Sequence, residues 1–107
     1  NPYNKNDYIY IDDFNKLMIK IINRKFKSEI FNVGTTISYS PVEILDKMND
    51  IMNTNIKSIN DVSKKNIFNF RANINKTKKV FDWSPKINMQ QGLKFIIKNK
   101  YYKKSNF

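Results

Sequence analysis

Residues 6–22 read NDYIYIDDFNKLMIKII, and this stretch decides the fold. Residues 8–11 (YIYI) are aromatic or β-branched, which is typical of a short buried strand. Asp12 or Asp13 can cap a following helix, because a carboxylate accepts hydrogen bonds from the free amides at a helix start. The apolar side chains of that helix recur at the spacing of one helical face: Phe14, Leu17, Met18, Ile21 and Ile22. The stretch therefore predicts a strand followed by an amphipathic helix that packs on a core.

A second strand and a second helix are predicted downstream. Residues 29–33 (EIFNV) favour a strand that ends at Gly34. The run Ser40-Pro41-Val42-Glu43 then places a hydroxyl at the N-cap, a proline at the first helical position and a carboxylate three residues after the cap, which is the pattern of a capping box. We expect this helix to span about residues 41–53, and a third short strand to follow at residues 56–59.

The last part of the chain predicts a polar loop at residues 60–66 and then two helices. Asn73 can cap a short helix, which must stop at Trp83-Ser84-Pro85 because proline cannot continue it. Asn88, with Gln91 in the reciprocal position, can cap the last helix, and residues 98–107 form a basic, aromatic tail that should fray. Strands and helices alternate without a linker, so the fold class is α/β and residues 1–107 form one small mixed domain.

Composition excludes several kinds of chemistry. The chain has 107 residues with no Cys and no His, so it cannot form a zinc finger, an iron–sulfur site, a disulfide or a Cys/His catalytic pair.

The net charge of +11 comes from the second half of the chain: residues 1–53 hold seven basic and seven acidic side chains, whereas residues 54–107 hold 13 basic and 2 acidic side chains. Because Asn, Ile and Lys share AT-rich codons and make up 51 of the 107 residues, we interpret the charge mainly as solvated surface. A half that is selected to bind nucleic acid or another anion is the alternative.

No recognisable catalytic centre is encoded. The only glycines are Gly34 and Gly92, so neither the G-x-G-x-x-G dinucleotide fingerprint nor a P-loop can form. A Tyr-x-x-x-Lys pair is also missing, and the adjacent carboxylates Asp12 and Asp13 are better explained by a helix start than by acid–base catalysis. Trp83 and Gly92 are interpreted as packing residues. The sequence predicts no catalytic residue, no cofactor-binding residue and no metal ligand.

Five short motifs carry a resemblance to a known family. The run NDYIYIDD (residues 6–13) resembles the Arg-Asp-[Phe/Tyr]-[Ile/Val]-[Tyr/His]-Val-x-Asp segment of the NAD-dependent epimerase/dehydratase family, the extended short-chain dehydrogenases that act on nucleotide sugars. The other four runs resemble that family's Tyr/Phe-Asn-Ile-Gly, Ala-Asp-x-Ser-Lys, Leu-Gly-Trp-x-Pro and Glu-Gly-Leu motifs: IFNVG (30–34), ANINK (72–76), FDWSP (81–85) and QGL (91–93). Together they cover about residues 6–98 in the family's order and spacing, which makes the resemblance fairly specific.

The resemblance is to the C-terminal part of that family. It implies a small mixed α/β substrate-binding domain that lacks the Rossmann half, where a complete enzyme binds NAD(P) and carries the Tyr-x-x-x-Lys dyad. For the parent enzyme it implies sugar-nucleotide epimerase, dehydratase or reductase activity in surface polysaccharide or O-antigen sugar biosynthesis. The 107 residues alone are expected to be inactive and to bind no cofactor. Because the first residue is Asn1 and not Met, we expect them to be a fragment of a longer or processed chain.

Partners and location follow from the same resemblance. It implies a nucleotide-sugar substrate, a contact with the Rossmann domain of the parent chain, a homodimeric parent and a cytoplasmic location. No membrane partner is expected, because the purely apolar runs are short, and the lysine-rich composition without a nucleic-acid motif disfavours nucleic acid. Two alternatives stay open beside this interpretation: a basic nucleic-acid- or anion-binding module, and an inactive truncated remnant.

The resemblance also implies five substrate-binding residues. Asn6 stands where the family commonly has an arginine that contacts substrate phosphate, and Tyr8 follows in the same motif, where it faces either the substrate or only the core. Residues 63–66 (SKKN) correspond to an Arg-x-Gly-Asp run in members that use uridine nucleotides. Lys64 or Lys65 could supply a positive charge to a phosphate, although without the bidentate fork of arginine, and Asn66 could hydrogen-bond the ribose. The loss of both arginines leaves the nucleotide open.

Overall fold

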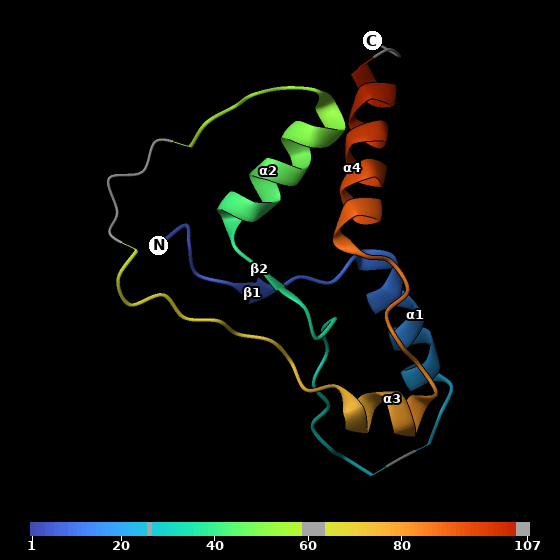
Figure 1. Cartoon of the computed structure of the whole chain (residues 1–107). Coiled ribbons are helices and arrows are strands. Elements are labelled where there is room, and N and C mark those ends of the chain that lie inside the picture. Colours follow the sequence, from blue (N-terminus) through green and yellow to red (C-terminus); the bar gives the residue numbers. More distant parts are fainter. Residues whose placement is uncertain (26, 59–63, 105–107) are drawn as a thin grey trace.

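The computed structural model is a small mixed α/β arrangement, and it describes residues 1–25, 27–58 and 64–104, without the side chains of residues 100–104 (Figure 1). In chain order the elements are β1 (Asn6–Asp7), α1 (Ile11–Ile22), β2 (Ser38–Tyr39), α2 (Pro41–Met52), α3 (Asn75–Phe81) and α4 (Met89–Lys104). Its dimensions are about 48 × 45 × 18 Å, so the molecule is flat.

A short sheet joins three distant parts of the chain. β1 pairs with β2 in antiparallel fashion, with Asn6 opposite Tyr39 and Asp7 opposite Ser38. On its other side, Lys5 forms a parallel bridge with Asn69. The Lys5 amide donates to the Phe68 carbonyl, and the Phe70 amide donates to the Lys5 carbonyl, both at 2.9 Å. Residues 5–7 therefore lie between β2 and the segment 68–70.

The three predicted strands are wrong in position. Residues 8–10 are extended but unpaired, and Ile11 already belongs to α1. Residues 29–33 and 56–58 form no strand, while residue 59 lies outside the described residues. Of the described residues in these stretches, Ile9, Tyr10, Phe31 and Val33 are partly buried and the others are exposed. The apolar and β-branched pattern does not specify pairing, because pairing depends on remote segments.

The helix starts predicted from capping chemistry at α2 and α4 are confirmed. At α2 the Glu43 amide donates to Ser40 Oγ (3.2 Å) and the Ser40 amide donates to Glu43 Oε2 (2.8 Å), which is a complete capping box. At α4 the Gln91 amide donates to Asn88 Oδ1 (2.8 Å) and the Asn88 amide donates to Gln91 Oε1 (3.0 Å). The helix α4 continues to Lys104, although the sequence predicted a frayed tail from residue 98. Residues 105–107 lie outside the described residues.

The other two helix starts differ from the prediction. Tyr10 is the N-cap of α1 and makes no side-chain cap bond, so neither Asp12 nor Asp13 caps this helix. Asp13 is instead fully buried, and its Oδ2 accepts from the amides of Lys86 (2.9 Å) and Ile87 (2.8 Å). The N-cap of α3 is Ile74 and not Asn73.

The core lies between α1, α3 and the segment that follows α3. Its buried apolar members are Leu17, Ile74, Phe81 and Trp83. The indole N–H of Trp83 donates to the Asp13 carbonyl at 3.0 Å, and the Phe81 ring packs edge-on against Phe31 with centroids 4.8 Å apart. The interpretation of Trp83 as a packing residue is therefore confirmed.

The rest of the molecule is open. The radius of gyration is 17.0 Å, against about 13 Å for a compact domain of this length. No residue of α2 is buried, and in Figure 1 residues 53–58 and 64–70 lie along the outer edge without a helix. Twelve large apolar side chains are exposed in the described part of the chain: Tyr8, Ile11, Ile19, Ile22, Ile30, Ile37, Ile56, Ile67, Phe68, Phe70, Phe95 and Ile96. This much uncovered apolar surface is typical of a surface that packs against another body.

Candidate functional site

The five predicted site residues lie in three places: in β1, in the segment before residues 68–70, and at an apolar cleft. Asn6 lies in β1 and is half-buried. Lys64, Lys65 and Asn66 are exposed and precede the segment 68–70, which pairs beside Lys5. Tyr8 directly follows β1 and lines an apolar cleft beside α4. The structure therefore places the lysines alongside the N-terminal segment and Tyr8 at a separate surface.

The second place is a basic, aromatic corner that we call the lysine corner, made of Tyr3 and residues 64–66. Lys64 Nζ lies 5.0 Å from the centroid of the Tyr3 ring, within the range of a cation–π contact. Asn66 has a φ of 57°, and asparagine tolerates this left-handed conformation better than most residues. Because the lysines are exposed, their ammonium groups can meet an anionic ligand without first leaving a buried site.

Hydrogen bonds fix the chain that follows the lysine corner. The Phe68 amide donates to Asn4 Oδ1 at 3.3 Å, and Ser38 Oγ donates to Asn69 Oδ1 from β2. With the two backbone bonds of Lys5, these contacts align residues 68–70 with β1. The position of the lysine corner is therefore set by the small sheet.

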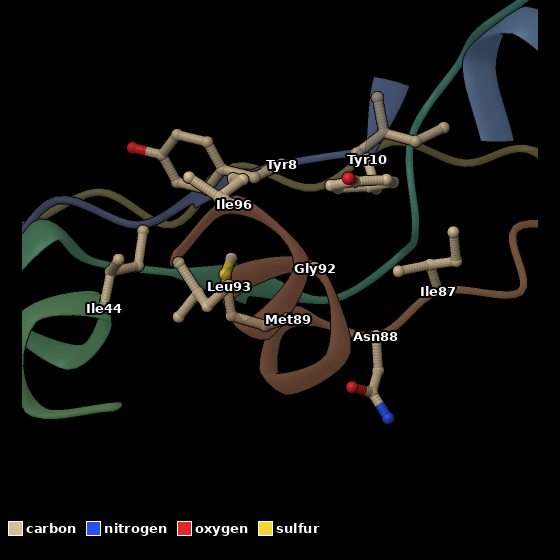
Figure 2. A pocket seen from close by; sticks show the side chains of 10 residues that line it. Tyr8, Tyr10, Ile44, Ile87, Asn88, Met89, Gly92, Leu93 and Ile96 are labelled. Atoms are coloured by element: carbon tan, nitrogen blue, oxygen red, sulfur yellow. The ribbon is translucent and has the colours of Figure 1, made fainter. Parts of the chain in front are cut away.

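The third place is the apolar cleft, which measures about 280 Å³ and lies between the residues after β1, α2 and α4 (Figure 2). It is lined by Tyr8, Ile9, Tyr10, Ile44, Ile87, Asn88, Met89, Gly92, Leu93 and Ile96. In Figure 2 the rings of Tyr8 and Tyr10 lie on the same side of α4, and the amide of Asn88 points away from them. The cleft suits an apolar group better than a phosphate.

Gly92 lies close to the Tyr10 ring. A Cβ at this position would lie 3.0 Å from Tyr10 Cδ2, which is tighter than most real Cβ contacts. The Tyr10 ring also packs against Phe95 of the same helix, with centroids 5.7 Å apart. The interpretation of Gly92 as a packing residue is confirmed.

An ion pair links Lys5, the residue before β1, to the start of α2. Lys5 Nζ donates to Glu43 Oε1 at 2.6 Å, while the other carboxylate oxygen of Glu43 accepts from the Ser40 amide. The hydrogen bond from Lys5, followed by that from Ser40, lowers the pKa of the Glu43 carboxyl below its usual value of 4.5. The two partners are 38 residues apart in sequence, which is why the sequence pattern did not indicate this contact.

Sequence reasoning also missed the role of Asp7, which entered only as one letter of a motif. Its Oδ1 accepts from the amide (2.7 Å) and the hydroxyl (2.6 Å) of Thr35, and its Oδ2 accepts from the amides of Thr36 (2.8 Å) and Ala72 (3.2 Å). These partners are 28 to 65 residues away, so no local pattern could have indicated them. Asp7 is the carboxylate with the densest set of remote contacts at the small sheet.

The residues present do not fit a nicotinamide dinucleotide. Such a cofactor needs glycines in a strand-to-helix turn, where the backbone approaches the pyrophosphate. Gly92 lies inside α4, and Gly34 is enclosed by Asp7 and Ala72, with neither glycine at positive φ. The described part of the chain also contains no group of three acidic side chains that could hold a metal ion, and none of its helices is both long and apolar enough to span a membrane.

Comparisons with known proteins give matches among solved structures only. No protein-family model matches the chain, and no curated protein matches it in sequence. The whole chain aligns with 34% of UDP-glucose 4-epimerase from Thermotoga maritima, solved with UDP-glucose, at 20% identity and a TM-score of 0.79. It also aligns over 91% of its length with 31% of UDP-glucose 4-epimerase from Bifidobacterium longum, solved with NAD+ and UDP (22% identity, TM-score 0.72). A third match is dTDP-glucose 4,6-dehydratase from Bacillus anthracis, solved with NAD (24% identity, TM-score 0.72, 87% of this chain and 30% of that chain).

These matches show the fold. The chain has the fold of a part of the NAD-dependent sugar-nucleotide epimerases and dehydratases, and the resemblance seen in the five motifs is confirmed at that level. The chain spans about a third of the length of these solved structures.

Proposed function

We propose that this chain is the C-terminal, nucleotide-sugar-binding portion of an NAD(P)-dependent sugar-nucleotide epimerase or dehydratase. The observation that carries the proposal is the match of the entire chain to 34% of a UDP-glucose 4-epimerase solved with UDP-glucose, at a TM-score of 0.79. The order of the five motifs supports the same interpretation. The surface-polysaccharide pathway and a cytoplasmic location belong to this proposal.

The lysine corner is the proposed anion-binding part of the site. Lys64 and Lys65 would neutralise the diphosphate as point charges, and Asn66 would hydrogen-bond the ribose. Asn6 lies on the adjacent strand, where its amide can donate to a phosphate oxygen. Tyr8 lines the apolar cleft, so we assign it a supporting role beside that cleft and not a place on the phosphates.

The remaining partner in this proposal is a Rossmann domain elsewhere in a longer, homodimeric parent. That domain would bind NAD(P), which supplies hydride transfer, since the described residues of this chain do not fit the cofactor. Docking of that domain would also cover part of the exposed apolar surface. This chain would contribute binding and orientation of the nucleotide sugar, which lower the barrier by fixing geometry.

A titration with matched lysine variants tests the proposal. UDP-glucose and UDP are titrated into the chain and into two double variants, Lys64→Ala/Lys65→Ala and Lys78→Ala/Lys79→Ala. Both variants remove two positive charges, but the second pair lies on α3, away from the lysine corner. We expect the first variant to lose at least tenfold in affinity for both ligands, and the second to bind like the wild type.

The other possible outcomes of these experiments contradict part or all of the proposed function. Equal losses in both variants, with affinity that falls steeply with salt and equal binding of an RNA oligonucleotide, would indicate a basic anion-binding module. Absence of binding in a folded chain to UDP, to UDP-glucose and, in a repeat titration, to dTDP-glucose would overturn the proposal. A measurable epimerase or dehydratase rate from the 107 residues with added NAD+ would contradict the division of labour between the two parts.

A further inference from the structure

The carboxylate of Asp7 joins three segments that are remote in sequence. It accepts hydrogen bonds from Thr35 (amide and hydroxyl), from the Thr36 amide and from the Ala72 amide. Asp7 lies in β1, and Thr35 and Thr36 precede β2. Ala72 ends the segment 64–72, whose first three residues belong to the lysine corner. One side chain thus connects the start of the chain to both of its sheet neighbours.

The Asp7 carboxylate accepts a hydrogen bond that the Asp7 carbonyl would accept if the parallel pairing continued. In a parallel ladder the bonds are evenly spaced at two-residue steps, so the pairing of Lys5 with Phe68 and Phe70 would continue with the Ala72 amide donating to the Asp7 carbonyl. The Ala72 amide donates to Asp7 Oδ2 instead, at 3.2 Å. The carboxylate therefore ends the ladder while it keeps residue 72 in register with β1.

The three segments are packed so closely that only glycine fits at position 34. A Cβ on Gly34 would lie 2.5 Å from Asp7 Oδ2 and 2.8 Å from the Ala72 Cβ. Thr36 has a φ of 70°, an unfavourable conformation for a β-branched residue, and its amide points at Asp7 Oδ2. Such a backbone persists because the surrounding contacts, those of Asp7 among them, hold it.

We propose that Asp7 is a positioning residue that holds residues 64–72, and with them the lysine corner, in register with the β1 strand that carries Asn6. This inference rests on the proposed function, in which Lys64, Lys65 and Asn6 contact the same ligand. They can do so together when the segment is anchored at both Lys5 and Asp7. A segment freed at Ala72 has to be ordered again at the moment of binding, and this entropy cost weakens affinity.

The first half of the test needs no ligand. Amide hydrogen exchange is measured by NMR on the full chain as wild type, Asp7→Ala, Asp7→Asn and Asp12→Asn. Asp12→Asn is the matched control, since Asp12 is exposed in the first turn of α1 and carries the same charge. We expect the amides of Thr35, Thr36 and Ala72 to exchange about tenfold faster or more in Asp7→Ala. The effect should be smaller in Asp7→Asn, which keeps one acceptor oxygen, and absent in the control.

The second half measures UDP affinity at a temperature where circular dichroism shows each variant folded. We expect Asp7→Ala to bind UDP about tenfold more weakly, with Asp7→Asn in between. Met18→Ala, which weakens the same core from α1 but removes none of the Asp7 hydrogen bonds, should bind UDP like the wild type. Faster exchange at Ala72 together with weaker UDP binding in Asp7→Ala, but not in Met18→Ala, supports the positioning role.

The failures can be told apart. Unchanged exchange at Ala72 in Asp7→Ala overturns the anchoring by Asp7. Faster exchange with unchanged UDP affinity overturns the positioning role alone, and so does an equal loss of affinity in Met18→Ala. A wild-type chain that is folded, protected at Ala72 and unable to bind UDP, UDP-glucose or dTDP-glucose overturns the proposed function, and the purpose assigned to the register with it.

Discussion

The part of the molecule around α1 and α3 and the part around α2 and the residues after it are built from similar residues but are packed very differently. Around α1 and α3, four apolar side chains are buried to 5% exposure or less, and Asp13 and Thr77 are fully enclosed with them. Around α2 no helical residue is buried, and every described residue from 54 to 70 is exposed. Both helices α1 and α2 are 12 residues long and carry an apolar face, so the difference does not lie in the helices themselves.

The difference lies in what each apolar face meets. The face of α1 meets α3, Trp83 and the chain after it, because the buried Asp13 ties this chain to α1 through two backbone amides. The face of α2 contacts α4, and its Ile44 lines the open cleft together with Tyr8 and Leu93. The first part is therefore held by buried contacts of its own, whereas the second is held by local capping and by the Asp7 contacts.

The largest expected effect tests this contrast directly. Leu17→Ala opens a cavity in the α1–α3 core and should lower the free energy of unfolding by about 2–5 kcal/mol. The matched variant Ile51→Ala removes an apolar group of similar size from half-buried α2 and should cost no more than about 1 kcal/mol. Urea unfolding followed by circular dichroism measures both values. Equal costs would show that α2 is as well packed as α1 and would remove the contrast.

The two glycines give the next largest effect. Gly34→Ala forces a Cβ against Asp7 and Ala72, which should cost about 1–3 kcal/mol of stability. The Cβ of Gly92→Ala lies 3.0 Å from the edge of the Tyr10 ring and in ordinary contact with Ile87, and a gain in helix propensity of up to about 1 kcal/mol offsets the tight contact, so this variant should be close to neutral. Thermal unfolding of both variants compares them. A neutral Gly34→Ala would mean that the three segments are not held as tightly as their distances indicate.

The cap of α2 gives a smaller effect. Ser40→Ala removes the hydroxyl that accepts from the Glu43 amide and should cost about 1 kcal/mol. Because α2 has no buried residue to compensate, the loss should appear locally, as faster amide exchange in the first turn of α2, while the amides of α1 keep their protection. Ser40→Thr retains the hydroxyl and serves as the control. Equal loss of protection in both helices would show that the two parts unfold as one unit.

The sequence predicted the elements whose causes are local. The capping boxes at Ser40 and Asn88 involve residues three positions apart, so their pattern alone located the starts of α2 and α4. The five motifs likewise indicated the fold, because their order reflects the whole chain.

What the sequence could not predict depends on remote partners. The strands were misplaced because residues 6–7 pair with residues 38–39 and Lys5 with Asn69, and nothing in those short runs specifies pairing. Asp13 was interpreted as a cap, although its partners are the amides of residues 86 and 87. The same holds for the candidate site: residues 64–66 could be named from the motif, whereas the Tyr3 ring beside Lys64 and the Asp7 contacts that hold the segment required the structure.

The smallest expected effect concerns the Lys5–Glu43 ion pair, which connects the open part to β1. The folded-state pKa of Glu43 is lowered, so this pair stabilises the fold above the usual carboxyl pKa of 4.5 and loses its effect as the pH falls through the lower folded-state value. The contribution should stay under about 1 kcal/mol, because both side chains remain more than a third exposed and water screens them.

The measurement is the difference in unfolding free energy between the wild type and Glu43→Gln, taken from neutral pH down to about pH 3. Asp50→Asn, on the exposed side of α2, is the control. The Glu43→Gln difference should shrink below pH 4.5 while the control difference does not follow it. A Glu43→Gln difference that stays constant over this range would mean that Lys5 does not pair with Glu43 in solution, and the link between β1 and α2 would then rest on the backbone bonds alone.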